Sequence, residues 1–150
     1  MRAVIQRVSR ARVTVDGRVT GEIGQGLLVL LAALKGDTEA ELEFMARKVS
    51  GMRIFTDNDG KMNLDVGAVG GSVLVVSQFT LAAPTASGNR PSFSSAMPPD
   101  EAQEMVERFK RRLETDYGLS VASGEFGAKM DVELVNDGPV TIIVDTANKA

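Results

Sequence analysis

Alternating apolar and polar residues near the start of the chain predict extended structure. Residues 2–8 and 11–15 alternate with period two, the pattern of a strand with one buried face. Asp16-Gly17 then separates the second run from residues 18–20, and an Asp-Gly pair in this setting favours a tight hairpin. The apolar run 26–32 predicts a strand buried on both faces, although its leucine content leaves a helix open.

Two segments have the spacing of amphipathic helices. Thr38 and Glu41 form a capping box, and apolar residues follow at helical spacing, so a helix is predicted from about 38 to 50. A second helix is closed by Gly118 and has residues 110–112, Lys-Arg-Arg, on its polar face. Its apolar face consists of Ala102, Met105, Val106, Phe109 and Leu113.

Further strands are predicted around these helices. The turn 57–60 precedes a short strand over 61–66, and the β-branched run 72–80 is typical of a central strand. Pro and Ser residues are frequent in 82–99, which indicates a functional loop rather than a regular element. Three closing strands are predicted at Leu119–Ser123, Met130–Val135 and Val140–Thr146, the last two joined through Asn136-Asp137-Gly138-Pro139.

The order of these elements favours an α+β domain with a mixed, mainly antiparallel sheet. A chain of 150 residues has the size of one domain, so residues 1–150 are predicted to fold as a unit. Two helices can cover only part of so much sheet. The rest must close into a barrel, face water or pair with a second subunit, and a symmetric homodimer is the commonest solution.

Composition narrows the chemistry that such a domain can perform. The chain has no Cys and no His, which excludes a thiolate nucleophile, a His base, a Ser-His-Asp triad and the usual Cys/His zinc sites. The net charge of −3 confines any nucleic-acid contact to local patches such as Arg2, Arg10, Arg12 and the 110–112 run. With no signal-peptide pattern and no apolar stretch of membrane-spanning length, the interpretation is a cytoplasmic protein with no membrane partner.

Two segments are candidate sites from their residues alone. Ser77-Gln78-Phe79-Thr80 lies where a predicted strand enters the Pro/Ser loop, and it would present backbone N–H groups to a cleft; an ordinary strand end is the competing interpretation. Gly138-Pro139 is either a trans turn, the commoner case, or a cis bond. Asp57-x-Asp59-Gly60 has its glycine too early for a calcium loop, and Gly21-x-x-Gly24-x-Gly26 has the wrong spacing for a phosphate loop. No metal and no cofactor is therefore predicted.

Four motifs follow one another along the chain: Ser77-Gln78-Phe79-Thr80-Leu81, Asn89-Arg90-Pro91-Ser92-Phe93, Gly124-Glu125-Phe126-Gly127-Ala128-Lys129-Met130 and Asn136-Asp137-Gly138-Pro139-Val140-Thr141. Together with the opening Met1-Arg2-Ala3-Val4-Ile5-Gln6-Arg7-Val8, they resemble the D-aminoacyl-tRNA deacylase family over essentially the full length. The resemblance implies that family's fold as a homodimer, with tRNA as partner and not DNA. It also implies hydrolysis of D-aminoacyl-tRNA, and of some glycyl-tRNA, in translation quality control.

The resemblance further implies a role for each site residue. Main-chain N–H groups of Phe79 and Thr80 would stabilise the oxyanion, with the Thr80 hydroxyl only positioning and the 2′-hydroxyl of the terminal adenosine assisting. Gly138-Pro139 would be cis and would enter the partner's site, where its carbonyls exclude L-aminoacyl groups. Ser77 and Gln78 would anchor the ribose and amine, Phe126, Gly127 and Met130 would form the adenine pocket, and Arg7 and Asn136 would support the Gly-Pro segment.

Two other classes of function stay open on the sequence. A non-enzymatic RNA-binding module would use the same cleft for the end of a tRNA. A structural dimer without a ligand would have the Ser77–Thr80 region filled by side chains. Neither would hydrolyse a D-ester, and the salt dependence of RNA binding would separate the first from the second.

Overall fold

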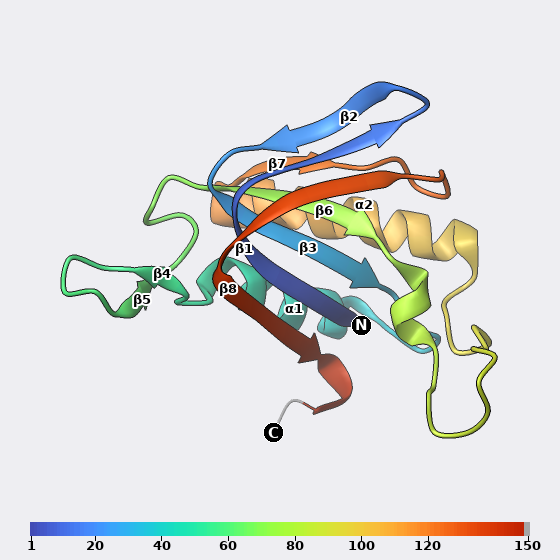
Figure 1. The fold of residues 1–150 in the computed structure, drawn as a ribbon. Helices are drawn as coiled ribbons and strands as arrows, with labels where there is room; N and C mark the ends of the chain where they lie inside the picture. Colours follow the sequence, from blue (N-terminus) through green and yellow to red (C-terminus); the bar gives the residue numbers. More distant parts are fainter. Residues whose placement is uncertain (149–150) are drawn as a thin grey trace.

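One long, curved strand organises the sheet. In the computed structural model, which describes residues 1–148, β1 (Arg2–Val15) pairs along nearly its whole length with β8 (Asp131–Asp145) (Figure 1). The first half of β1 also pairs with β3 (Gly26–Ala32), and its second half with β2 (Arg18–Ile23). All three partners run antiparallel to β1, and the β1–β2 connection is the predicted Asp-Gly hairpin.

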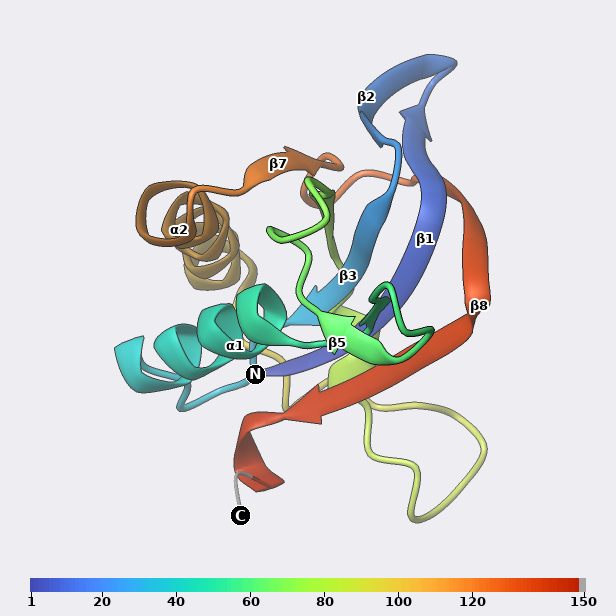
Figure 2. The ribbon, with the colours of Figure 1, turned by 90° about the vertical axis from the view of Figure 1, so that its left-hand side faces the viewer.

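The other half of the sheet is parallel. β6 (Ser72–Ser77) lies beside β3, and β7 (Ser120–Ser123) lies beside β6, both in parallel register. β4 (Phe55–Thr56) and β5 (Met62–Leu64) form a separate small ribbon. The main sheet is thus mixed, and it curls into the nearly closed, barrel-like arrangement visible in Figure 2. The prediction of an α+β fold with a mixed, barrel-like sheet and two main helices is confirmed.

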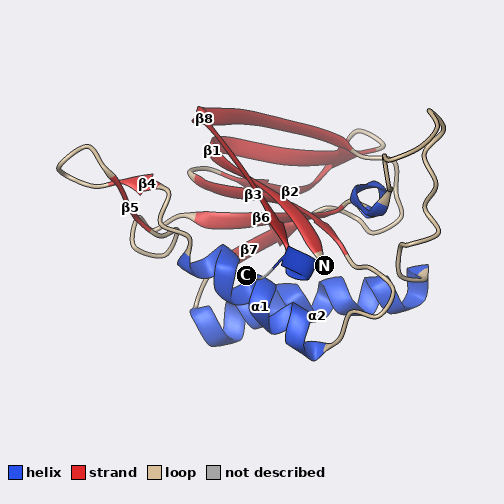
Figure 3. Ribbon diagram, turned by 90° about the horizontal axis from the view of Figure 1, so that it is seen from below, coloured by secondary structure: helices blue, strands red, loops and turns tan. Residues whose placement is uncertain are grey.

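Two helices cover one face of the sheet. α1 (Glu39–Gly51) begins at the predicted capping box, in which the Ala40 N–H donates to the Thr38 hydroxyl and the Thr38 N–H donates to Glu41. α2 (Pro99–Tyr117) ends at Gly118 as predicted. Figure 3 shows both helices as one layer beneath the strands. Within residues 1–148, neither helix is both long and apolar enough to cross a membrane.

The sheet separates two apolar cores. Ile5, Leu27 and Phe109 are fully buried in the core between the sheet and the helices. Leu28 and Leu74 point the other way, into a second core enclosed by the curled half of the sheet. Each such side chain contributes about 1.5–3 kcal/mol on burial. Burial on both faces explains why the segments that form β3 and β6 are almost continuously apolar.

Two predicted pairs of strands are single strands in the structure. The segments 2–8 and 11–15 both belong to β1. The segments predicted at 130–135 and 140–146 both fall in β8, which begins at Asp131 and ends at Asp145. β8 keeps its pairing with β1 through register shifts around Val8, and these absorb the Gly-Pro segment without ending the strand. The prediction of a turn between two strands was therefore wrong.

Several other boundaries differ from the predictions. The run 72–80 is a strand only as far as Ser77, and Phe79–Ala82 forms a short 3₁₀ helix, η1. The main-chain Gln78 N–H donates to the Leu31 carbonyl at 2.8 Å, and the chain then turns because Leu81 donates back to Gln78. The predicted strand over 61–66 is limited to β5, and its partner β4 was not predicted.

Candidate active site

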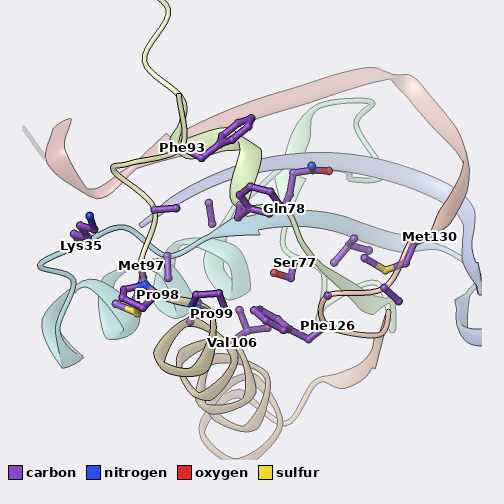
Figure 4. Close-up of a pocket in the computed structure, with 18 of the residues that line it drawn as sticks. Lys35, Ser77, Gln78, Phe93, Met97, Pro98, Pro99, Val106, Phe126 and Met130 are labelled. Atoms are coloured by element: carbon purple, nitrogen blue, oxygen red, sulfur yellow. The ribbon is translucent and has the colours of Figure 1, made fainter. Parts of the chain in front are cut away.

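A cleft of about 660 Å³ opens beside the end of β6 (Figure 4). Its walls come from β6 and η1, from the end of β3, from the loop before α2 with the first turns of that helix, and from the β7–β8 connection. Most of the lining is apolar; the Ser77 hydroxyl lies near the centre of the cleft, and the Gln78 amide lies toward its edge. A concave, apolar site with a few convergent polar groups is typical of small-molecule recognition.

Six of the predicted site residues line this cleft. Ser77, Gln78 and Phe79 reach it from β6 and the start of η1. The other three come from a distant stretch of the sequence, because the β7–β8 connection folds over the end of the sheet. They are Phe126, Gly127 and Met130, and Figure 4 shows the side chains of Phe126 and Met130 on one side of the cleft.

The start of η1 leaves two main-chain donors free of intrahelical partners. The Gln78 N–H is used by Leu31, and the first hydrogen bond of the turn is donated by Leu81. The N–H groups of Phe79 and Thr80 lie between these two, so the turn itself does not satisfy them. Thr80 does not line the cleft, and its hydroxyl accepts a hydrogen bond from Gln78 Nε2 at 2.5 Å.

Two residues without a predicted role at the cleft support η1. Arg2 donates through Nη1 to the Leu81 carbonyl at 2.5 Å and through Nε to the Asp145 carboxylate at 2.9 Å. Phe93 packs edge-to-face on Phe79, with ring centroids 5.1 Å apart, and the two residues are 38% and 54% exposed, respectively. Loop composition marked the segment around Phe93, but no spacing pattern in a loop shows which side chain folds back.

Gly138-Pro139 lies on β8, outside the cleft of its own chain. The bond is cis, both residues are exposed, and neither contributes to the cleft wall. Gly138 has a φ of 147°, and a Cβ there would lie 2.8 Å from the Val140 side chain and 2.9 Å from the Val140 nitrogen. Only glycine fits this position.

Arg7 and Asn136 hold the Gly-Pro segment in place. Arg7 is buried and donates to two carbonyls, Nε to Asp137 and Nη1 to Ile54, each at 2.7 Å. The Asn136 amide oxygen accepts from the Val140 N–H at 2.8 Å, so the side chain bridges the cis bond. The segment is therefore fixed by its own chain.

Most cations predicted for a nucleic-acid path already have carboxylate partners. Arg12 Nε lies 2.6 Å from Glu133, and this hydrogen bond and charge lower the pKa of Glu133. Lys110 lies 2.6 Å from Glu107, and Arg112 contacts Asp116 at 3.1 Å. Lys35, which lines the cleft, was not predicted to take part.

An α+β fold with a large apolar cleft, as residues 1–148 form here, is typical of proteins that bind a small ligand or the end of a larger one. The relatives of the chain define its class further. A family model described as D-Tyr-tRNA(Tyr) deacylase matches residues 4–145. A D-aminoacyl-tRNA deacylase of Roseiflexus castenholzii is 57% identical over 147 residues, 98% of this chain and 93% of that protein. One of Geobacter sulfurreducens is 55% identical over 150 residues, 100% of this chain and 98% of that protein.

Two solved structures share the fold. A c-Myc DNA unwinding element binding protein is 43% identical with a TM-score of 0.92, covering 97% of this chain and 99% of the other. A probable eukaryotic D-amino acid tRNA deacylase superposes with a TM-score of 0.81 at 17% identity, covering 95% and 97%, which supports the fold alone. The chain belongs to the D-aminoacyl-tRNA deacylase family, and the protein is accordingly an ester hydrolase, as the motifs predicted.

Proposed function

We propose that the cleft hydrolyses the ester between a D-amino acid and the terminal adenosine of tRNA, and that a second copy of the chain completes the site. One observation carries this proposal: the main-chain N–H donors of Phe79 and Thr80 lie at the start of η1 beside the cleft, whereas the Gly-Pro segment of the same chain lies outside it. The Gly-Pro segment that covers the cleft must then come from a second chain. The reaction is a proofreading step of translation. Its substrate places the enzyme in the cytoplasm.

The substrate end fits the two sides of the cleft. The adenine packs against Phe126, Gly127 and Met130, whose apolar surfaces form one wall. Stacking of a base on such a wall contributes about 1–3 kcal/mol. The ribose and the substrate amine lie beside the polar groups of Ser77 and Gln78. The ester carbonyl then lies toward η1.

Main-chain groups stabilise the charge that develops in the reaction. Water attacks the carbonyl carbon, and the tetrahedral oxyanion accepts hydrogen bonds from the Phe79 and Thr80 N–H groups. The bond to the ribose oxygen breaks, and the proton lost by the water goes to that oxygen with the help of the neighbouring 2′-hydroxyl. An activated ester needs no strong protein base, which agrees with a chain that has neither His nor Cys. The Thr80 hydroxyl positions the turn through its bond to Gln78.

The partner's Gly138-Pro139 carbonyls form the chiral wall. An L side chain would collide with them, a D side chain points away, and glycine has no side chain to exclude, so some glycyl-tRNA is also hydrolysed. Rigidity supports this role, because Arg7 and Asn136 fix the segment. A rotamer change cannot open a wall of backbone atoms.

An exposed apolar stripe supports pairing with a second copy. Ile143 on β8 is 70% exposed, although it is a large aliphatic residue. It lies directly across from Val4 on β1, which in turn lies across from Leu30 on β3, and both of these are only partly buried. β8 has β1 as its strand partner in the described part of the chain, so its other edge is unpaired.

The acceptor stem of the tRNA would follow basic residues outside the cleft. The candidates are Arg2, Arg10, Arg12 and the 110–112 run. Most of them have carboxylate neighbours, which predicts modest affinity. Binding should weaken as salt rises, because phosphate contacts release counterions. No membrane or DNA partner is part of the proposal.

The test is the release of amino acid from D-tyrosyl-tRNA and L-tyrosyl-tRNA, measured side by side with purified protein and no added metal. Fast loss of the D-ester alone is the expected result. If neither ester is hydrolysed while the tRNA still binds, the protein acts as a non-enzymatic RNA-binding module and the catalytic roles above fall.

A further inference from the structure

We infer that Gly124 sets the width of the base-binding side of the cleft, because its missing side chain makes room for Met130. Gly124 follows β7 and opens the connection that carries Phe126, Gly127 and Met130. It does not line the cleft, so it would act through another residue. The identity of the base as adenine rests on the proposed function.

The contact itself is specific. A Cβ built on Gly124 would lie 2.5 Å from the Met130 sulfur, a distance that real Cβ contacts essentially never show, so one of the two groups must shift. The next nearest atoms are Val13 Cγ1 at 3.4 Å and Cγ2 at 3.7 Å, which are ordinary contacts. Gly124 is not among the glycines with positive φ, so its backbone is open to alanine. Glycine is needed here for space and not for conformation.

Neighbouring bonds hold the backbone of Gly124 where it is. Its N–H donates to the Val75 carbonyl at 3.1 Å, just beyond the last β6–β7 pair, Val75 with Ser123. The side chain of Ser123 is itself held from α2, because Lys110 Nζ lies 3.1 Å from its hydroxyl. An added Cβ would therefore move the Met130 side chain rather than the main chain.

The open direction for Met130 is the cleft. On one side its side chain packs against the second core, which includes the fully buried Val13 and Leu74. On the other side, it lines the cleft and faces the space that the base would occupy. A close-packed core resists displacement, whereas the cleft is unfilled. Methionine is flexible, so the fold should survive while the base-binding side narrows.

A double-mutant cycle tests this inference. Gly124→Ala, Met130→Ala and the double variant are compared with the wild-type protein in kcat and KM for D-tyrosyl-tRNA. Because lost stacking is the cause, Gly124→Ala should raise KM about fivefold to tenfold with kcat changed less than about twofold. In the Met130→Ala background the same substitution should change KM less than about twofold, since the group that it displaces is gone.

Gly51→Ala is the matched control. Gly51 ends α1, is exposed, has an ordinary φ and has no atom within 4 Å of an added Cβ, so kinetics should not change. An equal KM effect of Gly124→Ala in both backgrounds would overturn the inference, as would a lowered Tm with unchanged KM. The first result would mean that Gly124 acts independently of Met130, and the second that Gly124 affects stability without affecting the width of the cleft.

Adenosine 5′-monophosphate separates this inference from the proposed function. Its dissociation constant is measured by calorimetry for the same four proteins, independently of turnover. Suppose that the dissociation constants of the four proteins follow the pattern expected for KM, but the protein hydrolyses neither D-tyrosyl-tRNA nor L-tyrosyl-tRNA. This result would support the role of Gly124 in base binding and reject the proposed reaction. No binding to the wild-type protein at millimolar nucleotide would overturn the inference, whatever the activity.

Discussion

The cleft and the Gly-Pro segment are both built in detail, but in opposite ways. The cleft is assembled from stretches far apart in the sequence, and the start of η1 beside it keeps main-chain donors free. The Gly-Pro segment is a short piece of one strand, its neighbouring polar groups are bonded by Arg7 and Asn136, and it points into solvent. The cleft has main-chain hydrogen-bond donors beside it and a cavity that can hold a ligand. The Gly-Pro segment is a rigid, exposed surface that lines no cleft in its own chain.

This difference assigns the hydrolysis of the ester and the selection of D- over L-aminoacyl groups to different regions of the molecule. In the proposed mechanism both tasks are performed by the main chain, by N–H groups at the cleft and carbonyls at the wall. Backbone groups on a rigid scaffold have few alternative positions, so neither the oxyanion donors nor the wall depend on rotamers. Only the union of two chains would place the wall over the cleft. Substitutions in the Gly-Pro segment can therefore change the D-over-L preference without changing the rate of ester hydrolysis. Substitutions at the cleft can change the rate without changing the preference.

The largest effect is expected for Pro139→Ala. Loss of the rigid wall should lower the ratio of kcat/KM for D-tyrosyl-tRNA to that for L-tyrosyl-tRNA at least about 100-fold, or about 2.8 kcal/mol. Hydrolysis of the D-ester should persist, because the cleft is unchanged. Pro84→Ala, in an exposed loop away from the cleft wall, is the control. An unchanged D-over-L preference would count against the wall.

Arg7→Ala should weaken both the fold and the wall. Removal of the guanidinium leaves the Asp137 and Ile54 carbonyls without their donor, which should lower the free energy of unfolding by about 2–3 kcal/mol in urea titrations. Arg7→Lys should lose less and keep part of the D-over-L preference. Arg12→Ala, which removes an exposed ion pair with Glu133, should change stability little. Destabilisation with full selectivity would limit Arg7 to a structural role.

Thr80→Ala should have a smaller effect, on the cleft alone. If main-chain N–H groups do the work, kcat/KM for the D-ester should stay within about tenfold of the wild-type value, and Thr80→Ser should be closer still. The circular dichroism spectrum should be unchanged, since the side chain is exposed. Complete loss of activity in a folded Thr80→Ala protein would instead make the hydroxyl the nucleophile.

The smallest effect on stability is expected for Asp145, which connects the cleft to the strand of the Gly-Pro segment. Its carboxylate accepts a hydrogen bond from Arg2, which also donates to Leu81 in η1, and Asp145 is the last residue of β8. Burial raises its pKa, but bonds from Ala147 and Arg2 and nearby positive charges outweigh this, so the pKa is lowered. The unfolded chain therefore takes up the proton first. The stabilisation is complete above pH about 4 and disappears as pH falls through the lowered pKa.

Asp145→Asn tests whether the ionised carboxylate of Asp145 stabilises the fold and whether this stabilisation is lost as the pH falls. The variant should melt slightly below the wild-type protein at pH 7, and the difference in Tm should shrink as the pH falls below about 4 and through the lowered pKa of Asp145. A difference that stays constant over the whole range would show that the charge of Asp145 does not stabilise the fold.

Local patterns predicted the parts of the fold that local forces determine. The capping box placed α1 within a residue at each end, because its bonds lie within one turn of chain. The end of β6 was missed, because the turn into η1 depends on a bond from Gln78 to Leu31 on another strand. β8 was divided in two because Gly-Pro is typical of a turn, and only the pairing with β1 keeps it one strand.

The site was predictable to the extent that motifs carried it. The motifs marked Ser77, Phe126 and Met130, which the fold brings to one cleft. They did not indicate Arg2 as a support of η1, because that contact joins residues 79 positions apart in the sequence. Nor did they distinguish a glycine required by its φ, such as Gly138, from Gly124, where the requirement is space.

Mixed dimers test the central claim, that wall and cleft come from different chains. Pro139→Ala protein, expected to hydrolyse both esters, is co-expressed under a second tag with a Phe126→Ala/Met130→Ala protein, whose wall is intact. Purified heterodimers then contain one site with both parts intact. The account predicts that these heterodimers hydrolyse D-tyrosyl-tRNA and spare L-tyrosyl-tRNA. If they hydrolyse the L-ester at half the rate of the Pro139→Ala homodimer or more, the wall acts on its own chain and the account is wrong.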